Sequence, residues 1–156
     1  MKATRRLFVG LLLTAVLVSM TCITAFAKNY ENKSFYNFTL ETDERYLKPQ
    51  SKEDDSPCYL RITAATTGRV TYISANGCAT GELMVFRDNK TLDGYGQIQQ
   101  HVVVSSYQDY RIRSRIYESG YRFASLGFSC SADFGNEVSG VWSPDSLGTY
   151  PFAYSS

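Results

Sequence analysis

The sequence predicts an all-β protein, an antiparallel β-sandwich or flattened barrel of seven to eight short strands, preceded by a signal-peptide helix. Tyr, Phe and Gly are abundant, and such a composition favours strands and turns over helices. Several segments alternate apolar and polar residues with a period of two, as half-buried strands do. Turn-forming residues separate these segments, which is typical of antiparallel sheets.

Residues 1–27 are predicted to be a cleavable secretory signal peptide. Positive charges lie within the first six residues, residues 7–23 carry no charge, and residues 25–27 read Ala-Phe-Ala, as signal peptidase requires. An uncleaved anchor is one alternative, but the apolar run is short for a membrane span. A lipoprotein linked through Cys22 is another, but the residues before Cys22 fit a lipobox poorly. We therefore expect export and cleavage after residue 27.

The remaining chain is predicted to have a flexible start, residues 28–33, and a single β domain, residues 34–156. Without the first 27 residues it holds 13 Lys and Arg against 15 Asp and Glu, a balance of −2. Such a mildly acidic domain has no electrostatic basis for binding nucleic acid. We expect membrane contact only through the signal peptide before cleavage.

In the first half of this domain, residues 34–40 alternate and predict a strand, with Phe38 and Leu40 facing inward. The highly charged stretch 41–57 predicts a loop. Residues 58–64 alternate most clearly. The face that we expect to be buried there consists of Cys58, Leu60, Ile62 and Ala64.

Turn residues then predict a hairpin. Thr67-Gly68 would join residues 58–64 to a return strand, 69–75, and Asn76-Gly77 would form the next turn. A short strand is expected at 83–86.

The second half of the domain adds a glycine-rich loop at 93–96 and four strands. These strands are predicted at 98–106, 110–117, 122–132 and 138–142. Residues 122–132 are a second strongly alternating segment, with Ala124, Leu126, Phe128, Cys130 and Ala132 on one face. Residues 143–146 predict a turn before the tail.

Three cysteines remain after processing, so an oxidising compartment would allow one disulfide and one thiol. In the predicted hairpin, Cys58 lies opposite Gly77, and a one-residue bulge would bring Cys78 opposite instead. We therefore predict a Cys58–Cys78 disulfide, with Cys130 as a small buried residue. A Cys58–Cys130 bridge between sheets is the alternative.

Arginine is concentrated in one segment. Arg111, Arg113 and Arg115 share one face of the predicted strand, and Arg122 follows the turn at Gly120. This row is a candidate anion-binding face for an acidic wall polymer or glycan. The alternative is a solvated edge strand, whose charges discourage aggregation.

The sequence predicts no catalytic site, metal site or cofactor. The chain has a single histidine, His101, and lacks a nucleophile-elbow motif and zinc-ligand spacing. Residues 88–94 are similar to the start of a calcium loop, but Lys90 occupies a ligand position.

The signal peptide, the β-rich body and the ending at 138–146 (VSGVWSPDS) resemble uncharacterised small secreted proteins of Gram-positive bacteria. This resemblance implies export from a bacterial cell, and it gives no activity to carry over, since the similar proteins are uncharacterised. We expect a non-enzymatic secreted β domain that binds a glycan, a wall polymer or an extracellular protein. The alternatives are a bacteriocin-like antagonist or its protector, and a small secreted hydrolase.

Overall fold

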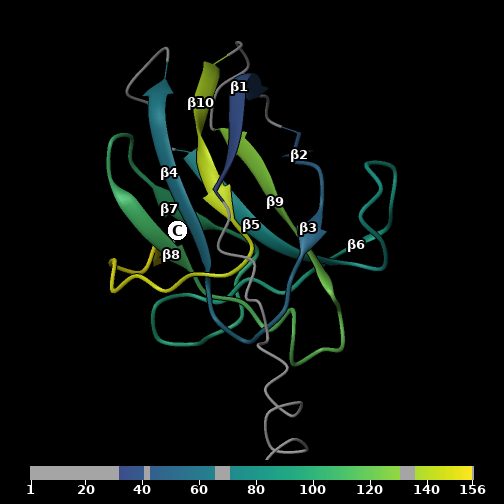
Figure 1. Cartoon of the computed structure of the whole chain (residues 1–156). Helices are drawn as coiled ribbons and strands as arrows, with labels where there is room; N and C mark the ends of the chain where they lie inside the picture. The colour runs from purple at the N-terminus through teal and green to yellow at the C-terminus, as the bar shows by residue number, and fades with distance from the viewer. Residues whose placement is uncertain (1–31, 41–42, 66–70, 131–135, 156) are drawn as a thin grey trace, which may run out of the picture.

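Two antiparallel sheets pack against each other in the computed structural model, which describes residues 32–40, 43–65, 71–130 and 136–155 (Figure 1). The strands are β1 (Lys33–Leu40), β2 (Arg45–Tyr46), β3 (Gln50–Ser51), β4 (Cys58–Ala65), β5 (Thr71–Cys78), β6 (Arg87–Asn89), β7 (Val102–Val104), β8 (Asp109–Ile112), β9 (Phe123–Cys130), β10 (Asn136–Ser143) and β11 (Tyr154–Ser155).

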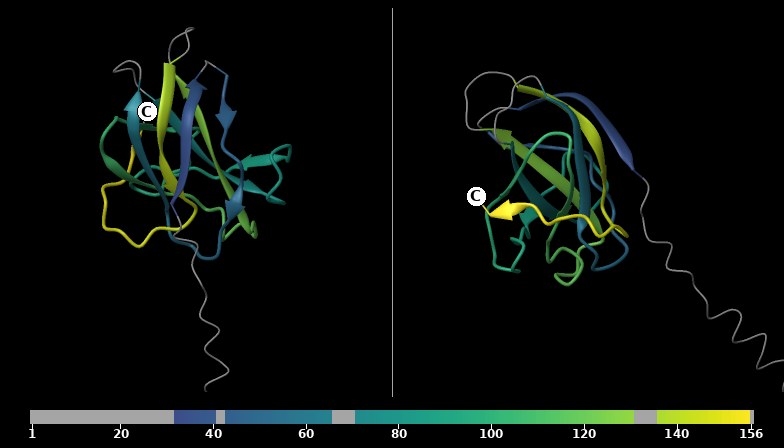
Figure 2. Two further views of the ribbon diagram at one scale, coloured as in Figure 1. Left: turned by 45° about the horizontal axis from the view of Figure 1, so that its top comes forward. Right: turned by 90° about the vertical axis from the view of Figure 1, so that its left-hand side faces the viewer.

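The four-stranded sheet has the order β1-β10-β4-β8, and the seven-stranded sheet has the order β11-β7-β5-β9-β2. In addition, β3 pairs with β9 and β6 pairs with β5. The C-terminal segment connects the edges of the two sheets (Figure 2), because Phe152 bridges to Arg111 on β8 while β11 pairs with β7. This segment therefore closes one edge of the sandwich.

The core lies between the sheets and follows the period-two pattern of the strands. On β4, Cys58, Leu60 and Ile62 are buried, as predicted. Ala64, also predicted to be buried, is exposed, and it lies beyond an irregularity in the β10–β4 register. The rings of Phe35 on β1 and Phe128 on β9 meet across the sandwich, with centroids 5.4 Å apart. One hydrophobic cluster therefore joins both sheets. The all-β prediction is confirmed for the described residues, which include no helix. The described strands number eleven and not seven to eight, because two-residue strands form in the predicted loop 41–57, as β2 and β3, and in the tail, as β11.

The predicted hairpin between residues 58–64 and 69–75 is wrong. β4 lies in the four-stranded sheet beside β10 and β8, whereas β5 lies in the other sheet between β7 and β9. Asn76 and Gly77 do not form a turn but continue β5. Gly77 packs against the ring of Tyr121, which a Cβ at this position would overlap. The glycine thus serves close packing and not a turn.

The hairpin was the geometric basis for the predicted disulfide, and the structure does not contain that bridge. Cys58 on β4 and Cys78 on β5 are free, buried thiols in different sheets. Cys58 lies opposite Ile112 in the β4–β8 ladder. Because Cys58 is a free thiol, the alternative bridge to Cys130 is also not present; Cys130 is buried, as expected for a small core residue.

Two other strand predictions shift. Residues 83–86 are not a strand, and β6 begins only at Arg87. β8 ends at Ile112, so Arg113 and Arg115 lie beyond it. Beyond β8, Ser114 forms an isolated bridge to Thr91 instead of extending the ladder.

The predicted signal peptide, residues 1–27, lies outside the described residues. Within the described ranges no helix has the length and apolar character needed to cross a membrane.

Candidate functional site

A shallow cleft of about 190 Å³ lies where β10 ends against β4. It is lined by Asn32, Tyr59, Ser143, Asp145, Ser146, Leu147, Gly148 and Tyr150. Pro144 ends β10, because proline has no N–H to continue the ladder. The hydroxyl of Ser143 donates to the carbonyl of Asp145 at 2.6 Å and fixes the turn that follows.

Two tyrosines form the aromatic wall of the cleft. The rings of Tyr59 and Tyr150 are 5.3 Å apart and tilted by 45°. The Tyr59 hydroxyl donates to Asp109 Oδ1 at 2.6 Å, and burial together with this bond raises the pKa of Tyr59. Gly148 lies so close to Tyr150 that a Cβ there would overlap the ring. The position of Tyr150 therefore depends on a glycine.

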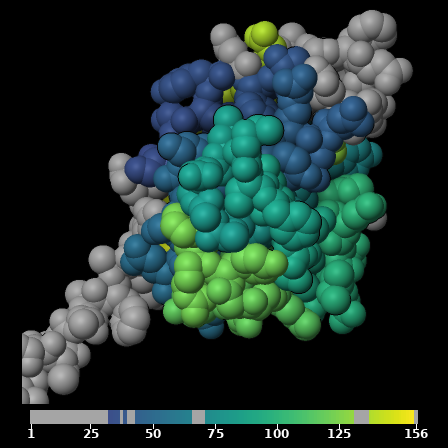
Figure 3. Space-filling model, turned by 90° about the vertical axis from the view of Figure 1, so that its right-hand side faces the viewer, coloured from purple at the N-terminus to yellow at the C-terminus, as the bar shows by residue number. Residues whose placement is uncertain are grey.

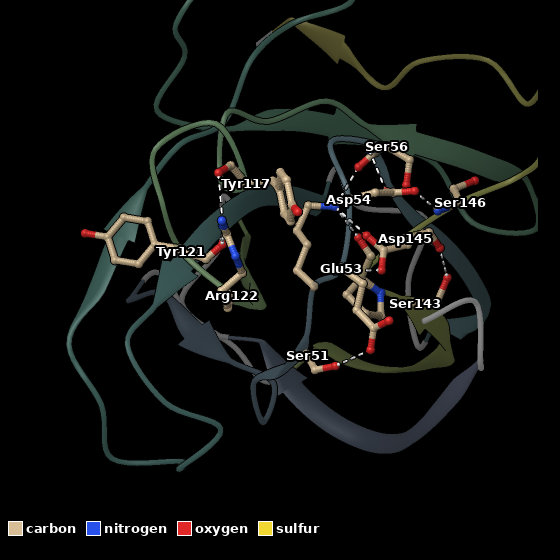
Figure 4. A network of polar contacts seen from close by, with 12 residues as sticks. Ser51, Glu53, Asp54, Ser56, Tyr117, Tyr121, Arg122, Ser143, Asp145 and Ser146 are labelled. Carbon is tan, nitrogen blue, oxygen red and sulfur yellow. Dashed lines mark hydrogen bonds and ion pairs between the residues drawn. The ribbon is translucent and has the colours of Figure 1, made fainter. Parts of the chain in front are cut away.

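Beneath the cleft, a buried lysine, Lys52, joins the loop after β3 to the turn after β10. Figure 4 shows Asp145 and Ser146 of this turn. Lys52 Nζ donates to Asp145 Oδ1 at 2.9 Å, to Ser56 O at 2.6 Å and to Pro144 O at 2.7 Å. The side chains of Lys52 and Asp145 are 1% and 0% exposed. All three protons of the ammonium group are thus used, as a buried charge requires.

The carboxyl group of Asp145 is held on both oxygens. The backbone N–H of Glu53 donates to Asp145 Oδ2 at 3.1 Å. Burial raises the pKa of Asp145, while the charge and hydrogen bond of Lys52 lower it, and the net direction is upward. The site therefore favours a carboxyl group that is either neutralised or protonated.

Ser146 connects this network to the cleft. Its backbone N–H donates to Ser56 Oγ at 3.1 Å. Its own hydroxyl oxygen is buried and has no hydrogen-bond partner among the described residues. A buried polar atom without a partner is the exception in folded proteins, and this one belongs to a residue that lines the cleft.

The predicted arginine row divides into two parts. Arg111 lies directly opposite Tyr59 in the β4–β8 ladder, and its Nε donates to Tyr150 O at 2.5 Å. The guanidinium groups of Arg111 and Arg113 lie 4.1 and 4.2 Å from the ring centroid of Phe152. Cation–π contacts therefore hold both arginines on Phe152, and Arg111 is thereby fixed beside the cleft.

The other two arginines of the predicted row, Arg115 and Arg122, do not share the Phe152 ring with Arg111 and Arg113. Arg115 is exposed. Arg122 stacks over Tyr117 at 4.1 Å and donates to the carbonyls of Tyr117 and Tyr121.

Other candidates from the sequence have structural roles. His101 is half-buried, and its ring meets the edge of Tyr72 at 4.6 Å. Asp93 closes its own turn, because its Oδ1 accepts from the N–H groups of Tyr95 and Gln97. The described residues contain no cluster of His, Cys, Asp and Glu that could hold a metal ion.

The buried thiol of Cys58 is not an activated nucleophile. Burial raises its pKa to about 11, so the thiol is protonated at neutral pH.

The sequence did not point to the floor of the cleft. Lys52 belongs to the stretch 41–57, which the sequence predicts as a loop, and Asp145 belongs to the predicted turn 143–146. The two residues are 93 positions apart in the chain. No local pattern marks such a pair. Tyr150 was one of many tyrosines in a strand-rich chain.

Comparison with curated proteins gave no significant match, and comparison with solved structures gave none either. A family profile does match, over residues 23–146, and its description is "Protein of unknown function (DUF2712)". Because this match covers most of the sequence, the chain belongs to the DUF2712 family.

Proposed function

We propose that this protein is an exported, non-enzymatic domain that binds an acidic glycan or wall polymer at the cell surface, in the cleft lined by Tyr59 and Tyr150. The observation that carries the proposal is the combination of this aromatic wall with Arg111 fixed beside it and Arg113 held on the same Phe152 ring. Arg111 is tied to both tyrosines of the wall, because it lies opposite Tyr59 in the β4–β8 ladder and donates to the carbonyl of Tyr150.

The aromatic wall supplies a surface for the apolar face of a sugar ring. Tyr150 is 39% exposed, and tyrosine combines a large apolar ring with a polar end. Ser146 lines the cleft, and rotation of its side chain would turn the unpartnered hydroxyl toward a sugar hydroxyl. These are the few convergent polar groups expected at a binding site.

The arginines supply the preference for an anion. Guanidinium groups bind phosphate and carboxylate groups through paired N–H donors. Because Arg111 and Arg113 are held on Phe152, little side-chain freedom is lost when they bind.

The size of the cleft supports a polymer unit over an enclosed cofactor. About 190 Å³ is smaller than the roughly 300–1,000 Å³ of pockets that enclose a small molecule. The carboxyl group that lines the cleft, that of Asp145, accepts hydrogen bonds from Lys52 Nζ and from the backbone N–H of Glu53. This arrangement favours binding over the two-carboxylate chemistry of a glycoside hydrolase.

A sedimentation assay tests the proposal. Purified Gram-positive cell walls, with their anionic polymers intact or removed, are mixed with the protein at low and high salt. We expect retention on intact walls, weaker retention after removal of the polymers, and weaker retention at high salt, because exposed charges are screened.

Matched variants locate the binding site. Tyr150→Ala should weaken retention by about tenfold, since an aromatic anchor contributes about 1–2 kcal/mol. Tyr95→Ala is the control, because Tyr95 is 90% exposed and does not line the cleft. No retention on either wall, or equal retention of both variants, would contradict the proposal.

A second function, the secreted antagonist, is favoured by one separate feature. Leu83, Met84 and Phe86 are 53%, 92% and 77% exposed, in the segment before β6 on the face that Figure 3 shows. Exposed apolar groups of this kind mark contact sites for membranes or proteins. Inhibition of related strains by wild-type supernatant, lost in Met84→Ser/Phe86→Ser, would support this function and displace wall binding.

A further inference from the structure

The buried contact beneath the cleft places an amine and a carboxyl group in position to react. We propose that Lys52 and Asp145 condense into a side-chain amide, an isopeptide bond that ties the loop after β3 to the turn after β10. This inference does not rest on glycan binding, and nothing in the proposed function requires the bond.

The geometry holds both reacting groups. Lys52 Nζ lies at hydrogen-bond distance, 2.9 Å, from Asp145 Oδ1, and Cγ, the carbon to be attacked, is the atom to which this oxygen is bonded. The carbonyls of Ser56 and Pro144 hold the nitrogen, and the N–H of Glu53 holds the second carboxyl oxygen. Neither partner can swing away without losing hydrogen bonds in the protein interior.

Burial favours the protonated, uncharged form of the carboxyl group that must react. Amide formation needs a neutral amine and a protonated carboxyl group. Burial of the carboxyl group is the largest influence on the pKa of Asp145 and raises it, and the charge of Asp54 acts in the same direction. With exposures of 1% and 0%, two separate charges are costly to keep at this place.

The step balances without an oxidant or a co-reactant. One proton moves from the ammonium group to the carboxylate along the 2.9 Å contact. The lone pair of Nζ then attacks Cγ of Asp145. A second proton passes from nitrogen to a carboxyl oxygen, which leaves as water, and the C–N bond remains.

The product also fits the site. The amide nitrogen keeps one N–H, which can donate to the carbonyl of Ser56 or of Pro144. The amide oxygen can accept from the N–H of Glu53. The bond replaces a buried ion pair by a neutral group. Because the site is buried, the amide is also shielded from the water that would hydrolyse it.

Intact-mass spectrometry of the purified full chain, reduced and denatured, tests the proposal. The N-terminus is first established by sequencing, and the measured mass is compared with the mass calculated from it. We expect the wild type to be lighter by one water, and Lys52→Ala and Asp145→Ala to have their full calculated masses.

Two further measurements identify the chemistry. Asp145→Asn should lose ammonia instead of water and reach the same final mass as the wild type. Peptide mapping should show the peptide with Lys52 joined to the peptide with Asp145, and no tryptic cleavage after Lys52. This map distinguishes the bond from a succinimide at Asp145, which also loses water. A wild-type chain of full mass, or a loss of water without joined peptides, would overturn the proposal.

Discussion

Replacing Lys52 by methionine should expose how much the fold depends on the pair beneath the cleft. Methionine has a similar length and fills the space of the aliphatic chain, but it removes the group that neutralises Asp145. It also removes the donor to the carbonyls of Ser56 and Pro144. Whether the wild type holds the pair as ions or as an amide, the variant leaves the buried carboxyl group of Asp145 without the amine of Lys52.

The expected decrease in the free energy of unfolding of Lys52→Met follows from the burial of Asp145. Asp145 is 0% exposed, and removing one partner of a buried ion pair costs about 3–5 kcal/mol. The double variant Lys52→Met/Asp145→Leu should recover much of this loss, because an apolar pair carries no desolvation penalty.

The stability lost in Lys52→Met should depend on pH. Burial raises the pKa of Asp145 above its unfolded value, so the folded variant binds the proton more tightly than the unfolded chain. The penalty is therefore full above the folded pKa and is relieved as the pH falls through it toward the unfolded pKa.

Urea unfolding followed by tryptophan fluorescence measures these differences. Trp142 is 2% exposed and reports on loss of the core. A single variant within about 1 kcal/mol of the wild type would refute the reasoning, since the buried pair is expected to cost at least about 3 kcal/mol to break. A double variant no more stable than the single one would refute it as well.

Two further variants or probes test the packing of the sandwich. Gly140→Ala should destabilise the protein by about 1–3 kcal/mol, because the new Cβ would overlap the carbonyl oxygen of Arg61 and the ring of Phe35; unchanged urea unfolding would contradict this close approach. Cys58, with its pKa raised to about 11 by burial, should not react with a thiol reagent at pH 8 until the protein unfolds, and rapid labelling of native Cys58, located by peptide mapping, would show that the thiol is accessible.

Alternation along single strands was enough to predict much of the fold. The buried face of β4 carries Cys58, Leu60 and Ile62, and that of β9 includes Leu126 and Phe128. A period of two fixes which side chains share a face. It does not fix which strand lies next to which, because pairing depends on residues far apart in the chain.

This limit explains the wrong hairpin. Thr67-Gly68 and Asn76-Gly77 carry strong local turn signals, yet β4 and β5 enter different sheets. The partners that decided the outcome are distant, since β4 pairs with β10 and β5 pairs with β9. The prediction of the disulfide rested on that hairpin and had no other geometric support.

The candidate site was predicted only in part. Arg111 and Arg113 were chosen because alternation placed them on one face, and the structure brings both to Phe152. Lys52 and Asp145 were missed, because a buried charge in a polar stretch looks like a solvated one until its partner is known. The Tyr59–Tyr150 wall likewise forms only when the C-terminal segment folds back along β8.

The most direct test of binding in the cleft is an NMR titration of the labelled protein with soluble fragments of anionic wall polymer. The account predicts saturable shift changes that concentrate on Tyr59, Tyr150 and Ser146 and on the side chain of Arg111. Shift changes centred on residues 83–86, or no change at saturating polymer, would contradict it.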